Sequence, residues 1–355
     1  MVQEQQGFSM TLEQVRALAR KKLKGICAAY PLCDGNFDRI CQRQAYGQPI
    51  GFGGAGQGRS FQANIKALAD VQFNMSVVGD HFEPDTSLSF LGINLKFPVI
   101  ASSTAGIEKY NDCMDETMFS KAVLQGAKKA GTIGFRGDTW FYTPSFNPSL
   151  DALKDCAGHG IPIFKPREQS VLKNLIEKAE ALGCIAVGVD LDGCGSTNMA
   201  DHGQPVFKKS VKDIKELVEY SSLPFIAKGI MMPDEAMECV DAGVKVISVS
   251  NHGGRVLDST PGVAAVLPLI RKRVGKSVTI TADGGVRTGY DVLKMLALGA
   301  DAVLLGRDII RAAVGAGADG VCIHLEHVKA TLKKAMFMTG KENIKTIDST
   351  ILFKT

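Results

Sequence analysis

The sequence of 355 residues contains no long uninterrupted apolar run. Each apolar stretch is broken by a charge or a glycine well short of the ~20 residues that span a membrane. Residues 1–24 also lack the apolar core of a secretory signal. A strong charge of one sign is missing as well, because the net charge is only +4 and the 41 Lys and Arg are spread along the chain. We therefore expect a cytoplasmic protein with no membrane segment and no nucleic-acid partner.

Cysteine spacing typical of a metal site is likewise absent. The nine cysteines are an odd number at irregular positions, which favours free thiols in a reducing compartment. Cys27, Cys33 and Cys41 lie close together, but their spacing matches no common zinc or iron–sulfur signature. We weigh ordinary thiols above a metal site there and expect no metal.

The sequence does contain an alternation of short apolar strands and amphipathic helices from about residue 97 onward. The predicted strands span 97–102, 130–135, 161–165, 184–190, 224–228, 245–250, 278–282 and 302–306. Helices are predicted between them, including 115–129, 169–182, 233–242 and 289–299. Eight strand–helix units in series predict a parallel sheet, and eight strands are the number that closes a barrel.

An open, doubly wound α/β sheet is the structural alternative. Such a sheet usually has a Gly-rich phosphate turn after its first strand. Here the first predicted strand leads into Ser102-Ser103-Thr104-Ala105, which is not a dinucleotide fingerprint. The sequence therefore favours the α/β class and a (β/α)8 TIM barrel.

The N-terminal part of the chain has a different character. A helix is predicted over 11–26, and residues 51–58 include five glycines in eight positions. This Gly-rich stretch is either a flexible connector or a backbone loop that closes over a ligand, since glycine permits close approach. We divide the chain into a helical and Gly-rich extension, 1–83, that packs on the barrel, and the barrel itself, 84–355.

Charged and hydrogen-bonding residues follow nearly every predicted strand. The active site of such a barrel is built at the carboxyl ends of its strands. In strand order these residues are Ser103 and Thr104, Arg136, Lys165 and Arg167, Asp190 and Asp192, Lys228, Ser250 to Arg255, Asp283 to Arg287, and Gly306 with Arg307. The excess of basic groups among them indicates an anionic ligand.

The loops after the last two strands are where such barrels commonly hold a phosphate. Gly284, Gly285 and Gly306 permit close approach of the backbone, and Arg287 and Arg307 add positive charge. We therefore expect a phosphorylated ligand or cofactor at this part of the rim.

One of the six histidines lies at a strand end proper, and that is His252. Histidine is the side chain best matched to proton transfer near neutral pH, so His252 is the candidate base. His202, in a polar loop after the fourth strand, is an outside candidate. We expect His324 and His327, on a late helix, to be part of the scaffold.

Three stretches carry a family resemblance: Ser250-Asn251-His252-Gly253-Gly254-Arg255-Val256-Leu257-Asp258, Ala282-Asp283-Gly284-Gly285-Val286-Arg287-Thr288-Gly289, and Leu305-Gly306-Arg307. They resemble the FMN-dependent α-hydroxy-acid oxidase and dehydrogenase family, of the glycolate oxidase, lactate oxidase and flavocytochrome b2 type. The likeness is close over 222–340, recognisable over 84–192 and thin at the N-terminus. It implies FMN as cofactor, a small anionic substrate and a homo-oligomer, expected to be a tetramer.

The resemblance also implies a role for each rim residue. His252, held by Asp192, would be the base that oxidises a small 2-hydroxy acid to the 2-keto acid, with a hydride passed to the flavin N5. Arg255 would bind the substrate carboxylate, and Tyr30 would be a second substrate-binding residue. Lys228 would lie at the pyrimidine edge of the flavin. The other implied cofactor contacts are Thr104, Ala105, Lys165, Ser250, Asp283, Gly284, Gly285, Arg287, Gly306 and Arg307.

The substrate side departs from the family pattern. Where the family usually has Gln and Tyr, this chain has Lys165 and Arg167. Gly137, next to Arg136, stands for a serine, and Asp190 stands for a threonine. A second carboxylate-binding arginine has no match. Either Arg167 supplies substrate contacts from another direction, or the substrate is larger than a simple 2-hydroxy acid.

Two other functions fit a flavin-binding barrel. One is an isomerase like the type 2 isopentenyl-diphosphate isomerase, and the other is a non-catalytic flavin-binding module. Neither needs the base and clamp pair of His252 and Arg255, so the sequence favours the oxidation.

Overall fold

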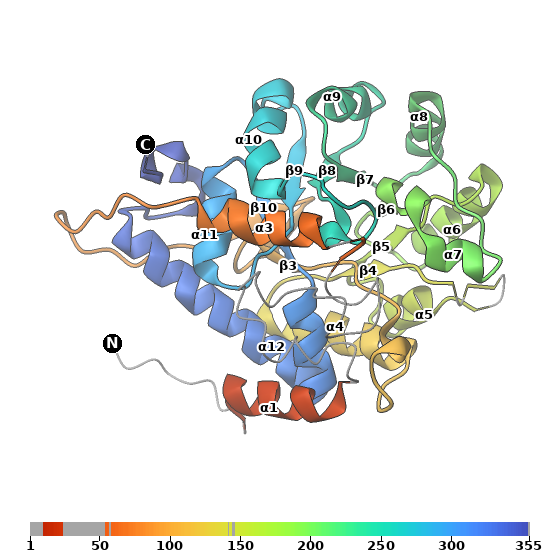
Figure 1. Cartoon of the computed structure of the whole chain (residues 1–355), viewed down its shortest axis with the longest axis horizontal. Coiled ribbons are helices and arrows are strands. Elements are labelled where there is room, and N and C mark those ends of the chain that lie inside the picture. Colours follow the sequence, from red (N-terminus) through yellow and green to blue (C-terminus); the bar gives the residue numbers. More distant parts are fainter. Residues whose placement is uncertain (1–9, 24–53, 57, 141, 144–145, 354–355) are drawn as a thin grey trace.

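The computed structural model describes residues 10–23, 54–56, 58–140, 142–143 and 146–353. Eight parallel strands form one sheet in the order β3-β10-β9-β8-β7-β6-β5-β4. A bridge between Ala101 and Gly134 joins the two ends of this order, so the sheet closes into a barrel with helices around it (Figure 1). The predicted (β/α)8 barrel is confirmed.

Each predicted barrel strand has a counterpart in the structure. The strands are β3 (Val99–Ala101), β4 (Phe135–Gly137), β5 (Ile161–Phe164), β6 (Val187–Asp190), β7 (Phe225–Ile230), β8 (Val246–Val249), β9 (Thr279–Ala282) and β10 (Ala302–Leu305). The prediction of a strand over 130–135 was too early, because Ala130 ends helix α4 and β4 begins at Phe135. Gly131, at φ +84°, ends that helix in the left-handed conformation.

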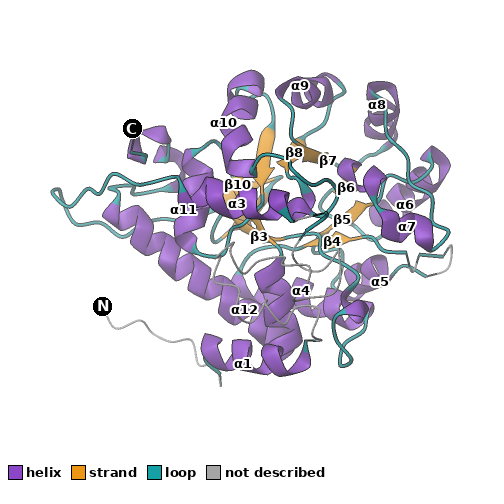
Figure 2. Cartoon of the chain, viewed as in Figure 1, coloured by secondary structure: helices purple, strands orange, loops and turns teal. Residues whose placement is uncertain are grey.

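The helices alternate with these strands (Figure 2). The α-helices of the barrel are α4 (Glu116–Ala130), α5 (Pro148–Asp155), α6 (Gln169–Ala181), α7 (Thr197–Asp201), α8 (Val211–Tyr220), α9 (Pro233–Asp241), α10 (Val263–Val274), α11 (Gly289–Ala297) and α12 (Arg307–Met338). Short 3-10 helices are η3 (Ile107–Lys109), η4 (Leu191–Gly195), η5 (His252–Gly254), η6 (Ile344–Thr346) and η7 (Ser349–Ile351). Local sequence explains several starts: Thr288 and Asp291, for example, form a capping box at α11.

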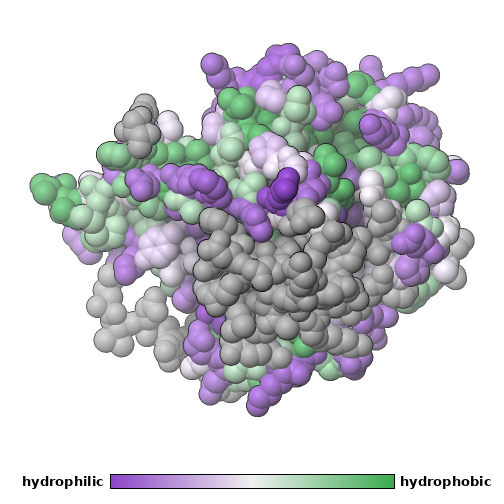
Figure 3. Space-filling model, in the orientation of Figure 1, coloured by the Kyte–Doolittle hydropathy of each residue, from purple (hydrophilic) through white to green (hydrophobic). Residues whose placement is uncertain are grey.

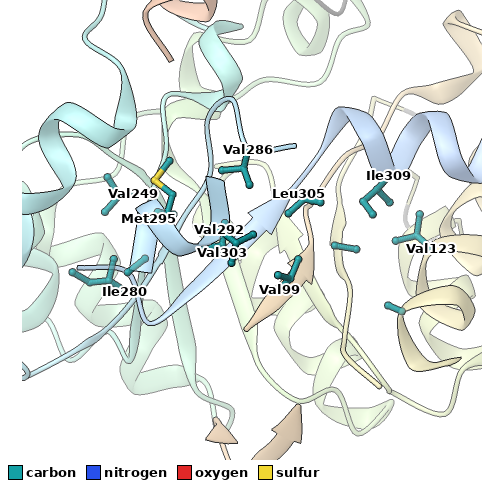
Figure 4. Packing of buried hydrophobic residues seen from close by; sticks show 14 of the residues in the cluster. Val99, Val123, Val249, Ile280, Val286, Val292, Met295, Val303, Leu305 and Ile309 are labelled. Carbon is teal, nitrogen blue, oxygen red and sulfur yellow. The ribbon is translucent and has the colours of Figure 1, made fainter. Parts of the chain in front are cut away.

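The core has two parts, one on each face of the strands. Outside the barrel, Val249, Ile280 and Val303 pack against Val292 and Met295 of α11 (Figure 4). The inward cluster contains Phe90, Leu95, Ile100, Ile133, Phe135, Ile161, Ile163, Ala186, Ile226, Val246, Ala302 and Leu304. Phe90 and Leu95 belong to an antiparallel hairpin, β1 (Leu88–Phe90) and β2 (Ile93–Leu95). The hairpin therefore contributes side chains to the barrel interior.

Two helices of the N-terminal extension pack on the barrel. Helix α1 (Leu12–Lys22) packs on α12, where the Lys22 ammonium donates to the Gly315 carbonyl at 2.9 Å. The chain is already extended at Leu23, so the helix is shorter than the predicted 11–26. A second helix, α3 (Arg59–Ala69), was not predicted and lies across the rim (Figure 1). It packs on η5, where Gly254 meets the backbone of Phe61.

The segment between α3 and β1 projects from the body at the left of Figure 1. It carries the exposed apolar side chains of Met75, Val77 and Val78, and this end of the molecule is green in Figure 3. Among the described residues, none of the helices combines the length and apolar character needed to cross a bilayer.

Candidate active site

A cavity of about 400 Å³ lies at the carboxyl ends of the strands. The predicted site residues that line it are Thr104, Ala105, Lys165, Lys228, His252, Arg255, Asp283, Gly284, Gly285, Arg287, Gly306 and Arg307. Ala55 and Gly56 line it as well, and the Ala55 N–H donates to the Gly254 carbonyl at 2.8 Å. The described part of the Gly-rich stretch thus lies against the ligand cavity, as the second of its two interpretations requires.

His252 is held by its backbone and by two carboxylates. It has φ +57°, an uncommon conformation for a residue with a Cβ, and Gly253 and Gly254 continue in the left-handed region. Its Nδ1 lies 3.1 Å from Asp192 Oδ1 and 3.3 Å from Asp190 Oδ2. Asp192 stands where the sequence predicts it, whereas the contact with Asp190 was missed.

Asp190 links His252 to two lysines. Lys228 Nζ donates to Asp190 Oδ1 at 2.9 Å, and Lys165 Nζ donates to Asp190 Oδ2 at 2.7 Å. Burial alone would raise the pKa of Asp190, but His252, Lys165 and Lys228 lower it well below its usual range. In the same way burial acts to lower the pKa of Lys228, and Asp190 with its neighbours raises it above its usual value. Both groups are therefore charged near neutral pH.

Asp190, Asp192 and His252 also bring three potential metal-ligand atoms within 4.8 Å of one another. Both oxygens of Asp190 already accept hydrogen bonds from lysine ammoniums. This arrangement is typical of a hydrogen-bonded charge cluster, since a bound cation would have to displace two cations from the carboxylate.

Ser250 connects this cluster to Asp283. The Ser250 hydroxyl donates to Asp283 Oδ2 at 2.8 Å and accepts from Lys228 Nζ at 3.3 Å and from the His252 N–H at 3.0 Å. Burial raises the pKa of Asp283 above its usual value, against the opposing effect of Lys228. Ser250 itself does not line the cavity but fixes three residues that do.

The other end of the cavity has the features of a phosphate site. Gly284 and Gly285 line the cavity with φ +91° and +86°, and a Cβ on either would crowd Asn64 of α3, so both positions require glycine. Helix α12 begins at Arg307, next to Gly306. Arg307 stacks on Phe61, with 4.1 Å from its Cζ to the ring centroid.

Asp308 lies at this end and was not predicted. Arg287 Nε is 3.4 Å from Asp308 Oδ2, and Arg311 also pairs with this carboxylate. Burial would raise the pKa of Asp308, but His324, Arg311 and Arg287 lower it below its usual range. Burial lowers the pKa of His324 to about 4, which agrees with a scaffold role for this histidine.

Arg255 projects toward the cavity from the loop after β8. Its Nη2 donates to the hydroxyl of Tyr110 at 2.9 Å, and Tyr110 is buried at the end of η3. Arg255 Nε is buried and has no hydrogen-bond partner among the described residues. The guanidinium is thus oriented by Tyr110 and retains a donor for an anion. Tyr30, the other predicted substrate contact, lies outside the described residues, as do Cys27, Cys33 and Cys41.

The structure does not place Arg167, a predicted substrate contact, among the residues that line the cavity. Its guanidinium is buried, with Nε 2.9 Å from Asp138 Oδ2 and Nη2 donating to the Thr139 carbonyl at 2.8 Å. It also pairs with Gln204 and stacks on Tyr142. Arg167 therefore ties two rim loops together.

Arg136 lies beneath the cavity wall. It is fully buried, and its Nη2 donates to the Thr104 carbonyl at 2.7 Å. Glu116, 3.8 Å from Arg136, accepts from the N–H groups of Gly106 and Ile107. The two side chains hold the segment 104–107, part of which lines the cavity. His202, the outside candidate, stacks on the cavity residue Trp140.

Comparison with known proteins decides the family. The family sequence model described as FMN-dependent dehydrogenase matches residues 50–202 and 194–354. The chain belongs to the FMN-dependent dehydrogenase family. This confirms the resemblance drawn from the motifs after β8, β9 and β10.

Proteins similar to this chain include oxidases of 2-hydroxy acids. Human 2-hydroxyacid oxidase 1 is 31% identical over 341 residues, which cover 85% of this chain and 90% of that protein. L-lactate oxidase of Lacticaseibacillus rhamnosus is 30% identical, with 81% and 84% covered. A crystal structure of mandelate oxidase superposes with a TM-score of 0.76 at 25% identity, over 98% of this chain and 99% of that one.

The residues present fit the FMN that the family implies. Thr104 Oγ1 and Asp283 Oδ1 are buried and lack a hydrogen-bond partner in the described part of the chain, so both can bond to a polar cofactor. The glycines at Gly284 and Gly285 leave the backbone open beside Arg287 and Arg307. These arginines would hold the phosphate, and Asp283 and Thr104 would contact the rest of the cofactor.

Proposed function

We propose that this chain oxidises a 2-hydroxy acid to the corresponding 2-keto acid, with His252 as the base. The observation that carries the proposal is the position of His252: its Nδ1 faces Asp192 and Asp190, and it shares a cavity with Arg255 and the phosphate site. The names of the relatives, 2-hydroxyacid oxidase and L-lactate oxidase, support the same substrate class.

His252 takes up the hydroxyl proton of the substrate. Because Nδ1 points at two carboxylates, it carries the ring proton in the neutral tautomer, and Nε2 is left to accept the new one. Asp192 and Asp190 stabilise the imidazolium that forms. A correctly placed base of this kind contributes about 10²–10⁴-fold to the rate.

Arg255 binds the carboxylate of the substrate and fixes its orientation toward His252. A guanidinium can form two parallel hydrogen bonds to a carboxylate. The Tyr110 hydroxyl orients the Arg255 guanidinium by accepting a hydrogen bond from it. FMN, when bound, supplies the acceptor for the two electrons and the hydrogen that leave the substrate Cα. Lys228 provides a fixed positive charge in the same cavity.

The proposal is tested by mixing the FMN-loaded protein with a panel of 2-hydroxy acids without oxygen and following the flavin absorbance. We expect one enantiomer of at least one acid to bleach the flavin. His252→Ala is expected to retain FMN and to lose bleaching by roughly 10²–10⁴-fold. His81→Ala, which replaces an exposed histidine whose ring meets Phe337 edge to face, serves as the matched control. Full FMN occupancy with no bleaching by any acid would contradict the proposal.

We also propose a homo-oligomer, expected as a tetramer, that works in the cytoplasm. The exposed apolar residues Met75, Val77 and Val78 support a contact surface for a second copy. The six cysteines in the described part of the chain form no disulfide, which supports a reducing compartment. Sedimentation of the wild type and a Val78→Asp variant tests the assembly, and cell fractionation tests the location.

A further inference from the structure

Asp190 is the residue on which the charged groups of the cavity converge. Its Oδ1 accepts a hydrogen bond from Lys228, and its Oδ2 accepts one from Lys165 at 2.7 Å. The same Oδ2 lies 3.3 Å from His252 Nδ1. Lys165 and His252 therefore meet at a single carboxylate oxygen.

Lys165 is held in this position by its surroundings. Its backbone N–H donates to Asp138 Oδ2 at 3.1 Å, directly after β5. Its aliphatic stem packs on Gly193, where an added Cβ would lie 2.9 Å from Lys165 Cδ. The side chain is only 13% exposed and lines the cavity. The ammonium is thus fixed by the loops after two neighbouring strands.

Asp190 is the carboxylate that Lys165 and Lys228 share in this part of the cavity. Lys165 and Lys228 each bring one positive charge, and a single buried carboxylate lies between them. A buried ammonium without a partner is strongly unfavourable. Burial of the Lys165 ammonium therefore depends on the Asp190 carboxylate, and burial of that carboxylate depends in part on Lys165.

We propose that Lys165 is a positioning residue, which holds Asp190 Oδ2 against His252 and cancels one unit of charge beside the cofactor. This rests on the proposed function, in which His252 is the base. Two consequences follow. Removal of Lys165 or of the Asp190 charge shifts the electrostatic potential at the cofactor in opposite directions. The effect of Lys165 on the reaction rate requires the Asp190 carboxylate, because Lys165 acts through it.

The experiment compares Lys165→Gln, Asp190→Asn, the double variant and Lys165→Arg, all loaded with FMN. The control is Lys173→Gln, which removes a partly exposed lysine that pairs with Glu216 at 2.7 Å outside the cavity. The first measurement is the midpoint potential of bound FMN, which needs no substrate. We expect a lower potential for Lys165→Gln, because reduced FMN carries more negative charge, and a higher one for Asp190→Asn. The double variant, Lys165→Arg and the control should stay near the wild type.

The second measurement is the rate of flavin reduction by a 2-hydroxy acid. We expect Lys165→Gln to slow it ~10-fold in the wild-type background and less than ~2-fold when Asp190 is already Asn, as for two directly coupled residues. Equal slowing in both backgrounds, or potentials that shift in the same direction, would overturn the proposal. If Asp190→Asn does not fold, a wild-type potential and rate in Lys165→Gln would overturn it. If no 2-hydroxy acid reduces the flavin of the wild type, the proposed function is wrong. The midpoint potentials of bound FMN would then still test the role of the Lys165–Asp190 ion pair.

Discussion

Glu116 offers a prediction whose size follows from the structure. Its side chain is 1% exposed, and its Oε2 accepts from the N–H groups of Gly106 at 2.8 Å and Ile107 at 2.9 Å. Burial raises the pKa of Glu116 to about 7, although Arg136 and the two N–H groups act to lower it. Replacement by Gln keeps an oxygen for the same N–H groups and removes the titration.

The sign of the effect follows from proton linkage. The folded state binds the Glu116 proton more tightly than the unfolded state, whose pKa is close to the ordinary 4.5. The stabilisation of the folded state by proton binding to Glu116 is therefore fully present below pH 4.5 and is lost as the pH rises through 7. At about 1.4 kcal/mol per pKa unit, the loss between pH 5 and pH 8 is about 2–3 kcal/mol.

The assay is urea unfolding of the wild type and of Glu116→Gln between pH 5 and pH 8. We expect the wild type to lose about 2–3 kcal/mol relative to the variant over this range. Glu219→Gln, on the exposed face of α8, is the control and should follow the wild type. A difference between the wild type and Glu116→Gln that does not change with pH would refute the reasoning.

Three further predictions concern the cavity and its surroundings. Arg255→Lys should raise KM for the acid ~10-fold or more with a smaller effect on kcat, because an ammonium cannot bridge a carboxylate in two places; steady-state kinetics that show unchanged KM would contradict the clamp. Arg167→Met should lower Tm, since it leaves Asp138 buried without its partner at a cost of roughly 3–5 kcal/mol. KM for the acid should stay unchanged, and a raised KM would indicate that Arg167 contacts the substrate after all. Gly284→Ala, at φ +91° with its Cβ 2.8 Å from Asn64 Oδ1, should weaken FMN binding in a fluorescence titration, and a wild-type Kd would contradict the cradle.

The barrel could be predicted because each strand is a short apolar run whose side chains are buried on both faces of the sheet. Boundaries were less certain where apolar residues continue from a helix into a strand, as between α4 and β4. Helix α3 was not predicted because the Gly-rich stretch before it was interpreted as a loop. The spacing of Phe61, Ile65 and Leu68 places three apolar residues on one helical face, and this signal could have revealed it.

The site could be predicted to the extent that each residue follows a strand directly. The contacts between strand ends could not, because they join residues far apart in sequence. Asp190 was noted as a strand-end residue and as a departure from the family pattern, but its contacts with Lys165, Lys228 and His252 were not predicted. Arg167 was assigned to the substrate because nothing in the sequence indicates that it pairs with Asp138.

The packing of α3 on η5 limits how this chain can be divided or recombined. A Cβ added to Gly254 would lie 2.4 Å from the Phe61 backbone nitrogen, and Asn64 Nδ2 donates to Asn251 Oδ1 at 2.8 Å. The loop that presents His252 is therefore shaped from outside the barrel. A fusion, circular permutation or transplant that begins at residue 84 would contain every strand of the barrel but would lack the α3 residues that pack on the loop holding His252. Residues 54–69 therefore have to be included with the barrel if the transplanted part is to remain an active enzyme.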